Sequence, residues 1–396
     1  MKIRVGLFFG GRSVEHEVSV ITGLQALANM DTERFDVTPI YITKKSELYV
    51  GEDIGKIEAY RDIPALMSRS TRMTLVNEGG RVYMVRQPAK KFGNNILGEL
   101  DVALPAVHGT NVEDGTLQGY LNFVGLPYAG CDILSSAVGM DKFVQKCVLK
   151  ESGIPVLDAL RLSANDASAV EKIEAKFEYP VIVKPLNLGS SVGISVAHDR
   201  AGLEDSLELA FQFAEHVIVE RAITDLTEIN CAVLGDEYSA QASVCERPLG
   251  SDEILSYEDK YVGGNSKGAK SGGSKGMASL GRELPARIPD ELRDRIQTLA
   301  VQAFRALGCS GVARIDFMID NESGELYLNE FNTIPGSLAF YLWEAGGMSY
   351  KEQLSRMVDL ALDRARREQS INFSFDSNIL ANVSFGGSKG AKGAKR

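Results

Sequence analysis

The sequence predicts an α/β protein that divides into three domains and a C-terminal tail. Its 396 residues exceed what one ordinary hydrophobic core accommodates, and chains of this length usually form two or three domains. Apolar runs of strand length alternate with helical segments, as in parallel sheets that are covered by helices. Hydrophobic residues make up 44% of the chain and charged residues 24%, which is typical of a globular protein.

The first domain is expected to span residues 1–130 and to open with a strand, a turn and a helix. The apolar run Ile3–Phe9 predicts the strand, and the pair Gly10–Gly11 predicts a tight turn. Ser13 is a suitable cap for a helix that begins near Glu15. This order is typical of the beginning of a parallel sheet.

Two further strands are predicted in this domain, at Phe35–Ile42 and Asp101–Val107. In parallel sheets, ligands gather at the carboxyl ends of the strands. The segments Gly11–Ser13 and His108–Gly109 both stand at such ends. We therefore expect a binding site to include residues of both segments.

The second domain is expected to be a small lid at residues 131–216. It contains a predicted helix at Met140–Lys150 and a predicted strand at Val181–Lys184, which runs into the glycine-rich segment Asn187–Gly193. Backbone N–H groups of such a segment can hold phosphate oxygens.

The third domain is expected at residues 217–372. Its predicted strands are Val217–Glu220, Ala313–Ile319 and Leu326–Asn329. The tail at residues 373–396 ends in a run of Gly, Ser and Lys, so we expect it to be partly disordered.

A second low-complexity segment lies inside the third domain, at residues 263–276. Glycine and serine make such a chain flexible, and lysine keeps it solvated. Lys260 and Tyr261 flank it on the N-terminal side. The segment is therefore interpreted either as a mobile loop beside a site or as a linker.

The charge of the chain limits its partners. A formal net charge of -10 argues against broad nucleic-acid binding, which requires a basic surface. No apolar run approaches the roughly 18 residues that cross a bilayer, and glycine interrupts the N-terminus too soon for a secretion signal. We therefore expect a cytoplasmic protein with neither nucleic-acid nor membrane partners.

Four polar side chains are predicted to share one face of a late hairpin. Alternate residues of a strand point the same way, so Arg314 points with Asp316, and Glu330 with Asn332. If the strands pair around residues 320–324, this face collects two carboxylates, an amide and a guanidinium. Such oxygen ligands suit magnesium, which usually binds one or two carboxylates plus substrate phosphates. A solvated face with a salt bridge is the alternative interpretation.

Two lysines stand near the glycine-rich segment. Lys184 ends the strand that precedes Gly189–Gly193, and Lys142 opens the preceding helix, so both can reach the same phosphates. The segment lacks the G-x-x-x-x-G-K-[ST] pattern of a P-loop. A glycine-rich turn without a ligand is the alternative.

A third group of polar residues follows the strand that ends near Val107. His108 begins it, and Glu113 and Asp114 introduce a helix. Each has an ordinary structural interpretation, because an interior histidine and acids in a first helical turn are common.

Together these motifs resemble the D-alanine–D-alanine ligase family of the ATP-grasp fold. The resemblance covers the chain up to about residue 370, and it implies a Rossmann-like N-terminal domain and two α+β domains that enclose ATP. It rests on five motifs in order: Gly10–Ser19, His108–Gly119, Met140–Lys142, Lys184–Gly193 and Arg314–Gly336.

For the amino-acid substrates, the resemblance implies the following roles. Glu15 would hold the ammonium group of the first D-alanine, and His108 would lie near the substrates. Glu113 would support the site from its helix. Tyr261 would close the mobile loop over the substrates.

For the nucleotide, the resemblance implies that Lys142 and Lys184 contact the α- and β-phosphates and that Lys260 reaches the γ-phosphate. The other implied nucleotide contacts are Ser190, Ser191, Glu220, Ile223 and Glu228. Glu220 and Ile223 would meet the adenine, and Glu228 the ribose.

The resemblance also implies the chemistry. Asp316, Glu330 and Asn332 would bind two magnesium or manganese ions, with Glu330 bridging them. A D-alanine carboxylate would attack the γ-phosphate of ATP, and a second D-alanine would attack the resulting acyl phosphate. The catalytic residues would be Glu15, Ser190, Tyr261, Arg314 and Gly336. The product would serve peptidoglycan synthesis, and the enzyme is expected to be a homodimer.

The chain departs from the family pattern most strongly after Gly336. Typical members have a longer segment there, with a serine that holds the carboxylate of the second substrate. Ser337 is the candidate substitute in the segment Ser337–Gly347. Two alternatives therefore stay open: a ligase with another acceptor, such as D-serine, D-lactate or another amino acid, and a nucleotide-binding regulator without turnover.

Overall fold

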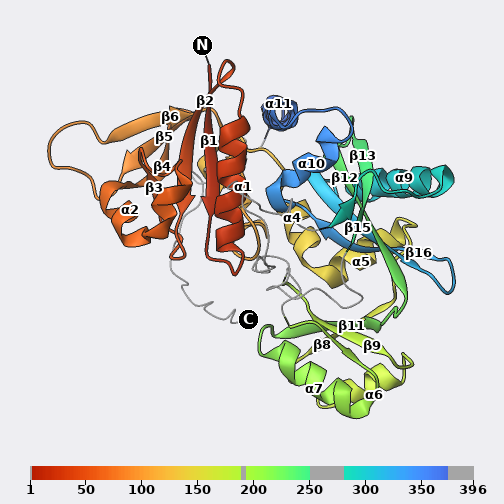
Figure 1. Cartoon of the computed structure of the whole chain (residues 1–396). Helices are drawn as coiled ribbons and strands as arrows, with labels where there is room; N and C mark the ends of the chain where they lie inside the picture. The colour runs from red at the N-terminus through yellow and green to blue at the C-terminus, as the bar shows by residue number, and fades with distance from the viewer. Residues whose placement is uncertain (1, 189–192, 250–280, 373–396) are drawn as a thin grey trace, which may run out of the picture.

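The computed structural model describes residues 2–188, 193–249 and 281–372 (Figure 1). These residues form three sheets of seven, four and five strands, with helices packed against them. The predicted α/β class is confirmed.

The seven-stranded sheet forms the N-terminal part of the molecule. Its strand order is β6-β5-β4-β3-β2-β1-β7, and β1 (Ile3–Gly10) pairs in parallel with β2 (Phe35–Ile42) and β7 (Val102–Pro105). These are the three predicted strands, although β7 is shorter than expected. Helix α1 (His16–Asn29) follows β1, and its N-cap is Glu15. Ser13 does not cap the helix, but its Oγ accepts a hydrogen bond from the Glu15 N–H at 3.1 Å.

An antiparallel extension of this sheet was not predicted. Its strands pair in sequence order beyond β2. They are β3 (Leu48–Val50), β4 (Thr71–Glu78), β5 (Arg81–Arg86) and β6 (Ile96–Leu100). The accompanying helices are η1 (Ile57–Arg61), α2 (Ile63–Arg69) and α3 (Thr116–Val124).

The helix expected at Met140–Lys150 is present with slightly shifted bounds, and a further helix precedes it. Helix α4 (Ile133–Met140) ends before Asp141, and α5 (Lys142–Glu151) begins after it. The Asp141 carboxylate accepts hydrogen bonds from the N–H groups of Phe143 and Val144, so it caps α5. Lys142 consequently stands at the first position of a helix.

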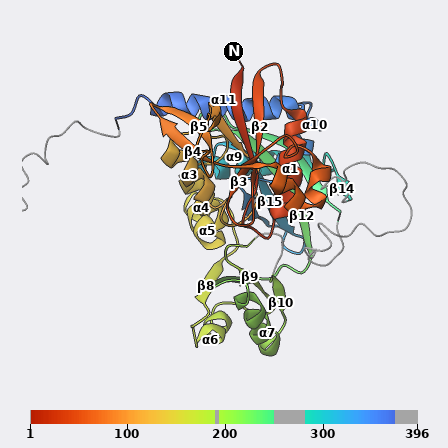
Figure 2. The ribbon, with the colours of Figure 1, turned by 90° about the vertical axis from the view of Figure 1, so that its left-hand side faces the viewer.

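The four-stranded sheet projects from the rest of the molecule with its own helices (Figures 1 and 2). Its strand order is β10-β9-β11-β8. Its elements are β8 (Ala159–Ser163), α6 (Ala169–Glu174), β9 (Val181–Pro185), β10 (Ser195–Ala197), α7 (Arg200–Phe211) and β11 (His216–Arg221). Their apolar residues form a separate core, which includes Leu162, Val183 and Val219.

This sheet corrects the expected domain organisation at both ends. Strand β11, which was assigned to the third domain, pairs with β8 and β9 instead. Helix α5, which was assigned to the lid, buries Leu149 in the same core as Phe304 of the third domain. Both corrections have one cause, because long-range packing rather than sequence order decides which sheet an element joins.

The five-stranded sheet has the order β14-β13-β12-β15-β16. Its strands are β12 (Leu226–Gly235), β13 (Gln241–Pro248), β14 (Arg282–Glu283), β15 (Gly311–Asp320) and β16 (Leu326–Asn332). Strands β15 and β16 form the predicted hairpin. The associated helices are α9 (Asp290–Ala306), η3 (Gly336–Ala339), α10 (Phe340–Glu344) and α11 (Tyr350–Glu368).

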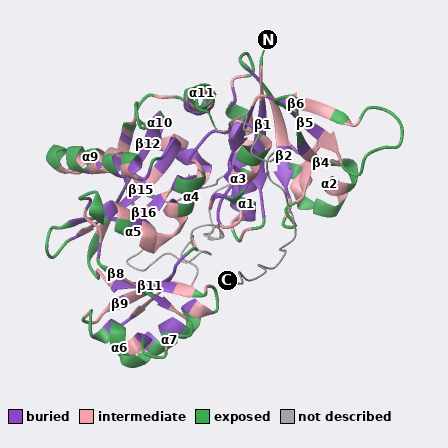
Figure 3. Cartoon of the chain, turned by 180° about the vertical axis from the view of Figure 1, so that it is seen from behind, coloured by how far each residue is buried: buried purple, intermediate pink, exposed green. Residues whose placement is uncertain are grey.

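Helix α11 joins the first and third domains. Its residues Leu354 and Val358 are buried in one core with Val5 of β1 and Val312 of β15. Figure 3 shows that buried positions concentrate on the strands of these two sheets. Within the described residues, no helix is both long enough and apolar enough to cross a membrane.

Candidate active site

A row of polar side chains crosses the five-stranded sheet. Glu330 of β16 is the cross-strand partner of Asp316 of β15, which faces Asn230 of β12, which in turn faces Glu246 of β13. Cross-strand partners point to the same face of a sheet. The row therefore extends the predicted face of the β15–β16 hairpin by two strands.

Arg314 and Asp316 form a buried ion pair within this face. Arg314 donates from Nε to Asp316 Oδ1 and from Nη2 to Oδ2, each at 2.7 Å, and Asn332 Nδ2 donates to Oδ2 at 3.0 Å. Asp316 is only 4% exposed. Burial raises the pKa of Asp316, and Arg314 opposes this shift. The prediction of a shared face is confirmed, and the alternative of a solvated face is wrong at Asp316.

A β-bulge brings two consecutive residues of β16 to this site. Asp316 pairs with Glu330 while Phe317 pairs with Leu328, so Asn329 is the extra residue. Lys184 Nζ donates to Asn329 Oδ1 at 3.3 Å, and Lys142 Nζ lies 3.3 Å from Glu330 Oε1. The two predicted lysines therefore meet the hairpin side by side.

A buried carboxylate holds Lys184. Glu220 at the end of β11 is fully buried, and its oxygens lie 2.8 Å from Lys184 Nζ and 2.7 Å from Lys146 Nζ. Burial alone would raise the pKa of Glu220, but the two lysines outweigh it and lower the pKa to about 2. The Glu220 side chain thus faces the lysines, which differs from its expected position at the adenine.

The other expected nucleotide contacts lie on either side of this cluster. Lys142 Nζ also donates to the Leu188 carbonyl oxygen at 2.7 Å, so it links α5 to the end of the β9 segment. Ile223 is half-buried in the connection between β11 and β12, and Glu228 is exposed on β12. Ser190, Ser191, Lys260 and Tyr261 lie outside the described residues.

His108 connects the N-terminal domain with the segment after β16. Its Nε2 lies 2.8 Å from Thr22 Oγ1 of α1, and its Nδ1 lies 2.9 Å from the Ile334 carbonyl oxygen. Burial lowers the pKa of His108 to about 4. The ring is therefore neutral near pH 7.

Glu113 makes a parallel connection. Its carboxylate accepts hydrogen bonds from the Gly109 N–H at 2.9 Å, the Thr333 hydroxyl at 3.1 Å and the Ile334 N–H at 2.9 Å. Burial and the charge of Glu15 raise the pKa of Glu113 to about 8, against the effect of these donors.

Gly109 permits the close approach of Glu15 to this connection. Its φ of +80° is unfavourable for a residue with a side chain, and a Cβ there would lie 2.7 Å from Glu15 Oε2. Glu15, Gly109 and Glu113 therefore lie close together, as the expected position of the site at the ends of β1 and β7 requires.

The segment after Gly336 is a left-handed turn. Ser337, Leu338 and Ala339 have φ values of +52°, +51° and +50°, a conformation that costs about 1–2 kcal/mol per residue when a side chain is present. The Ser337 N–H donates to Thr22 Oγ1 at 3.1 Å, and Gln353 Nε2 of α11 donates to the Leu338 carbonyl at 2.7 Å. Ser337, the candidate substitute, is buried in this turn.

Known proteins resemble this chain over nearly its whole length. Family models described as the N-terminus and the C-terminus of D-ala D-ala ligase match residues 4–131 and 148–359. A D-alanine–D-alanine ligase of Acetivibrio thermocellus is 39% identical over 379 residues, which cover 92% of this chain and 96% of that protein. One of Thermosipho melanesiensis is 35% identical over 378 residues, 96% of this chain and 98% of that protein.

The chain belongs to the D-alanine–D-alanine ligase family. This family consists of ATP-dependent ligases, so ATP is a substrate. Solved members agree with the fold: the D-alanine–D-alanine ligase of Coxiella burnetii gives a TM-score of 0.76 at 26% identity, covering 93% of this chain and 96% of its own. The VanG D-Ala:D-Ser ligase of Enterococcus faecalis gives 0.75 at 30% identity, covering 91% and 100%. The predicted ATP-grasp fold is confirmed.

The donors on the β15–β16 face of this ligase fit magnesium. No cluster of three or more His, Cys, Asp or Glu side chains occurs among the described residues. The face instead supplies two carboxylates and one amide, from Asp316, Glu330 and Asn332. Magnesium usually completes such a small protein set with water and substrate phosphates, and the lysines that meet this face suit phosphates as well.

Sequence reasoning missed three residues of the ligase site. Lys146 stands four residues after Lys142, so the i, i+4 spacing on a helix was the signal that both lysines share one face. Asn329 was missed because strict alternation of side chains along the strand was assumed, and a bulge interrupts this alternation. Glu246 carried no local signal, since its place in the polar row depends on pairing across four strands.

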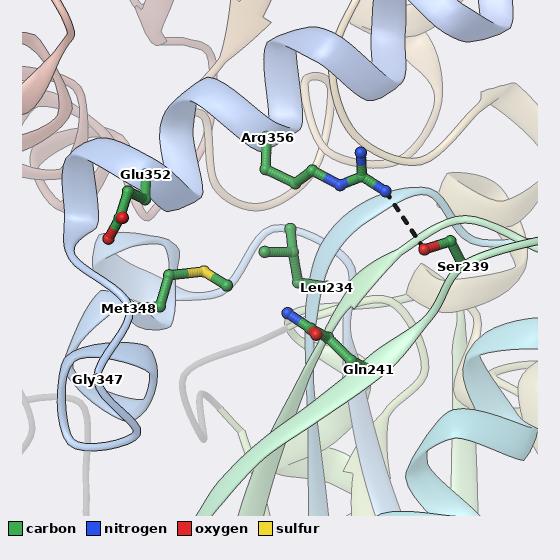
Figure 4. Close-up of a pocket in the computed structure, with 7 residues that line it drawn as sticks. All are labelled: Leu234, Ser239, Gln241, Gly347, Met348, Glu352 and Arg356. Atoms are coloured by element: carbon green, nitrogen blue, oxygen red, sulfur yellow. Dashed lines mark hydrogen bonds between the residues drawn. The ribbon is translucent and has the colours of Figure 1, made fainter.

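A pocket of about 520 Å³ lies elsewhere in the molecule (Figure 4). It is lined by Leu234, Ser239, Gln241, Gly347, Met348, Glu352 and Arg356. Arg356 of α11 donates to Ser239 Oγ at 3.3 Å across it. None of these lining residues belongs to the polar row or to the lysine cluster, so we do not assign the ligase chemistry to this pocket.

Proposed function

We propose that the protein joins two D-alanine molecules at the expense of ATP and forms D-alanyl-D-alanine for peptidoglycan synthesis. The observation that carries this proposal is the hydrogen-bonded Arg314–Asp316–Asn332 group around the buried Asp316, which stands beside Glu330 and the two lysines Lys142 and Lys184. This arrangement combines oxygen ligands, phosphate-binding cations and an oxyanion donor in one face. Family membership supports the same reaction.

The lysines form the phosphate end of the proposed site. Lys142 and Lys184 contact the α- and β-phosphates, and Glu220 holds Lys184 in place. Because the Glu220 carboxylate faces Lys146 and Lys184, we propose that the backbone beside Glu220, rather than its side chain, contacts the adenine. Further proposed nucleotide contacts are Ser190, Ser191, Ile223, Glu228 and Lys260.

Asp316, Glu330 and Asn332 are proposed to hold two magnesium or manganese ions. When bound, these ions offset the charge of the phosphoryl group during its transfer. Arg314 orients the Asp316 carboxylate through two hydrogen bonds and opposes the rise that burial causes in its pKa.

The amino-acid end of the proposed site begins at Glu15. Its carboxylate holds the ammonium group of the first D-alanine, whose carboxylate then attacks the γ-phosphate and becomes an acyl phosphate. His108 and Glu113 position the segment after β16, which leads to Gly336. Tyr261 closes over the substrates and excludes water, which would otherwise hydrolyse the acyl phosphate.

Acyl transfer completes the reaction. The amine of the second D-alanine attacks the acyl carbon, a tetrahedral oxyanion forms, and inorganic phosphate leaves. Arg314 and the Gly336 N–H are the proposed oxyanion donors. Loss of one such donor typically lowers the rate by about 100- to 1000-fold.

We also propose a cytoplasmic location and a homodimer for this ligase. Its proposed domains are an N-terminal domain at 1–130, a central domain centred on the β8–β11 sheet, and a C-terminal domain that includes α5 and ends at residue 372.

The acceptor is the part of the reaction that needs a direct test. A D-Ala:D-Ser ligase is among the structural relatives, and the segment proposed to adjoin the acceptor forms a left-handed turn at Ser337–Ala339. The test incubates purified protein with ATP, magnesium and D-alanine, alone or with D-serine or D-lactate, and identifies products by mass spectrometry. We expect D-alanyl-D-alanine. Preferential formation of a mixed dipeptide or a depsipeptide, or ATP binding without turnover, would overturn the proposal.

A further inference from the structure

A second, largely buried arginine lies at the far end of the polar row. Arg282 of β14 has an exposed side-chain fraction of 15%, and its Nη1 lies 3.1 Å from Glu246 Oε2. The Arg282 guanidinium also lies over the Tyr341 ring, with Cζ 4.2 Å from the ring centroid. Tyr341 donates its hydroxyl hydrogen to Glu246 Oε1 at 3.0 Å. Together, Glu246, Arg282 and Tyr341 form what we call the β13 cluster.

The β13 cluster belongs to the same face as the proposed metal ligands. Arg282 is the cross-strand partner of Pro248, which lies two residues after Glu246, so Arg282 and Glu246 point the same way. Glu246 lies two strands from Asp316 along the polar row. Two strand spacings place Glu246 roughly 10 Å from Asp316. A small amino acid together with a long arginine side chain can span this distance.

Tyr341 connects the β13 cluster with Arg314. Asn230 Nδ2, between the two groups in the row, donates to Glu246 Oε1 at 3.1 Å. Burial raises the pKa of Tyr341 to about 12, and the positive charges of both Arg314 and Arg282 oppose this rise. The Tyr341 hydroxyl is therefore within electrostatic range of both guanidinium groups.

The left-handed turn explains why Tyr341 reaches this place. The turn ends at Ala339, and α10 begins directly at Phe340, so Tyr341 enters the helix in its first turn. Gln353 of α11 donates a hydrogen bond to the Leu338 carbonyl oxygen and so anchors the turn to this helix. The short segment after Gly336 thus delivers an aromatic hydroxyl onto the reactive face.

We propose that Arg282 binds the carboxylate of the acceptor amino acid, and that Glu246 and Tyr341 position its guanidinium. This inference rests on the proposed ligase function. An amino-acid acceptor must present its amine near Arg314 and must place its carboxylate against a cation. Arg314 already gives two N–H groups to Asp316. Arg282 has the planar, multi-donor geometry that suits a carboxylate, and stacking on Tyr341 limits its motion.

A purely structural role makes a different prediction. If the β13 cluster only fastens β14 and α10 to β13, its loss would affect every reaction of the enzyme alike. If Arg282 binds the acceptor carboxylate, its loss would affect only acceptors that carry one.

The experiment compares two acceptors on the same acyl phosphate. D-alanine as acceptor carries a carboxylate and yields the dipeptide; hydroxylamine carries none and yields D-alanine hydroxamate, with phosphate leaving in both cases. For R282Q we expect the KM for the acceptor D-alanine to rise about 10- to 100-fold, the range of a lost charge-assisted hydrogen bond. Hydroxamate formation and the KM for ATP should stay within about twofold of the wild type.

Two variants keep the test decisive. R282K retains the charge beside Glu246 but cannot bind a carboxylate in the same planar way, so we expect a smaller rise in the acceptor KM with the same unchanged hydroxamate rate. R287Q is the matched control, because Arg287 lies five residues further along the chain and its side chain is 89% exposed. It should leave both reactions unchanged.

The outcomes separate the two proposals. If wild-type protein forms no dipeptide, the proposed function fails. If wild-type protein forms dipeptide but R282Q and R282K keep its acceptor KM, the assignment of Arg282 is overturned while the function stands. An equal fall of dipeptide and hydroxamate formation in both variants would also overturn it, because that is the signature of a structural role.

Discussion

The two ends of the proposed site are held together by different forces. At the amino-acid end, His108 and Glu113 join the N-terminal domain to the segment after β16 through hydrogen bonds between buried groups. At the phosphate end, Lys142, Lys146 and Lys184 are held by the carboxylates of Glu330 and Glu220.

We infer that the enzyme is rigid at the amino-acid end and exchanges partners at the phosphate end. The hydrogen bonds of His108 and Glu113 link protein groups to one another and do not involve the residues that are proposed to contact ATP. Lys142, in contrast, is bound to Glu330, and both residues are assigned to the nucleotide and its metal ions. We therefore expect ATP binding to rearrange charge pairs at the phosphate end while the amino-acid end stays as it is.

The largest effect is expected at the phosphate end, from Glu330→Gln. The substitution removes a metal-binding charge from a preformed face and should lower kcat by at least about 100-fold, since metal ions contribute several kcal/mol of charge stabilisation. Steady-state ADP release measures the effect. The melting temperature should change little, because Glu330 is only partly buried.

Glu325→Gln is the control for this experiment, since Glu325 is an exposed carboxylate that precedes the same strand. A near-normal rate in Glu330→Gln would remove Glu330 from the chemistry. The charge pair with Lys142 would then be structural.

Local patterns in the sequence predicted the β15–β16 face, and non-local pairing explains what they missed. The hairpin and the position of Arg314 beside Asp316 follow from alternation and one turn. The bulge at Asn329 does not, because it breaks the alternation within this hairpin without a local signal. The sheet of β11 does not either, because it depends on pairing with β8 and β9, which are distant in sequence. The turn at Ser337–Ala339 contains no glycine to signal its positive φ, so tertiary contacts with Thr22 and Gln353 impose it.

An intermediate effect is expected from Lys146→Met, which tests whether the phosphate end also carries stability. Glu220 would lose one of its two partners while it remains fully buried, which should lower the free energy of unfolding by about 3 kcal/mol. Urea denaturation measures the change. Lys150→Met on the same helix is the control, because its pair with Asp158 is exposed and should contribute little to stability. Equal small losses in both variants would mean that the Glu220 charge is balanced by Lys184 alone.

The smallest effect concerns the amino-acid end and its dependence on pH. The pKa of Glu113 is about 8 in the folded protein and near 4.5 in the unfolded chain, so between these values the folded state binds one proton more. Stability from this group is therefore complete below pH 4.5 and is lost as the pH rises towards 8, by at most about 1.4 kcal/mol per pH unit. In Glu113→Gln this loss should disappear, so the free energy of unfolding should fall less between pH 6 and pH 7 than in the wild type. Glu58→Gln, at an exposed position of the same domain, should keep the wild-type slope. An unchanged slope in Glu113→Gln would show that the three donors keep Glu113 ionised, and the amino-acid end would then be held by charge as the phosphate end is.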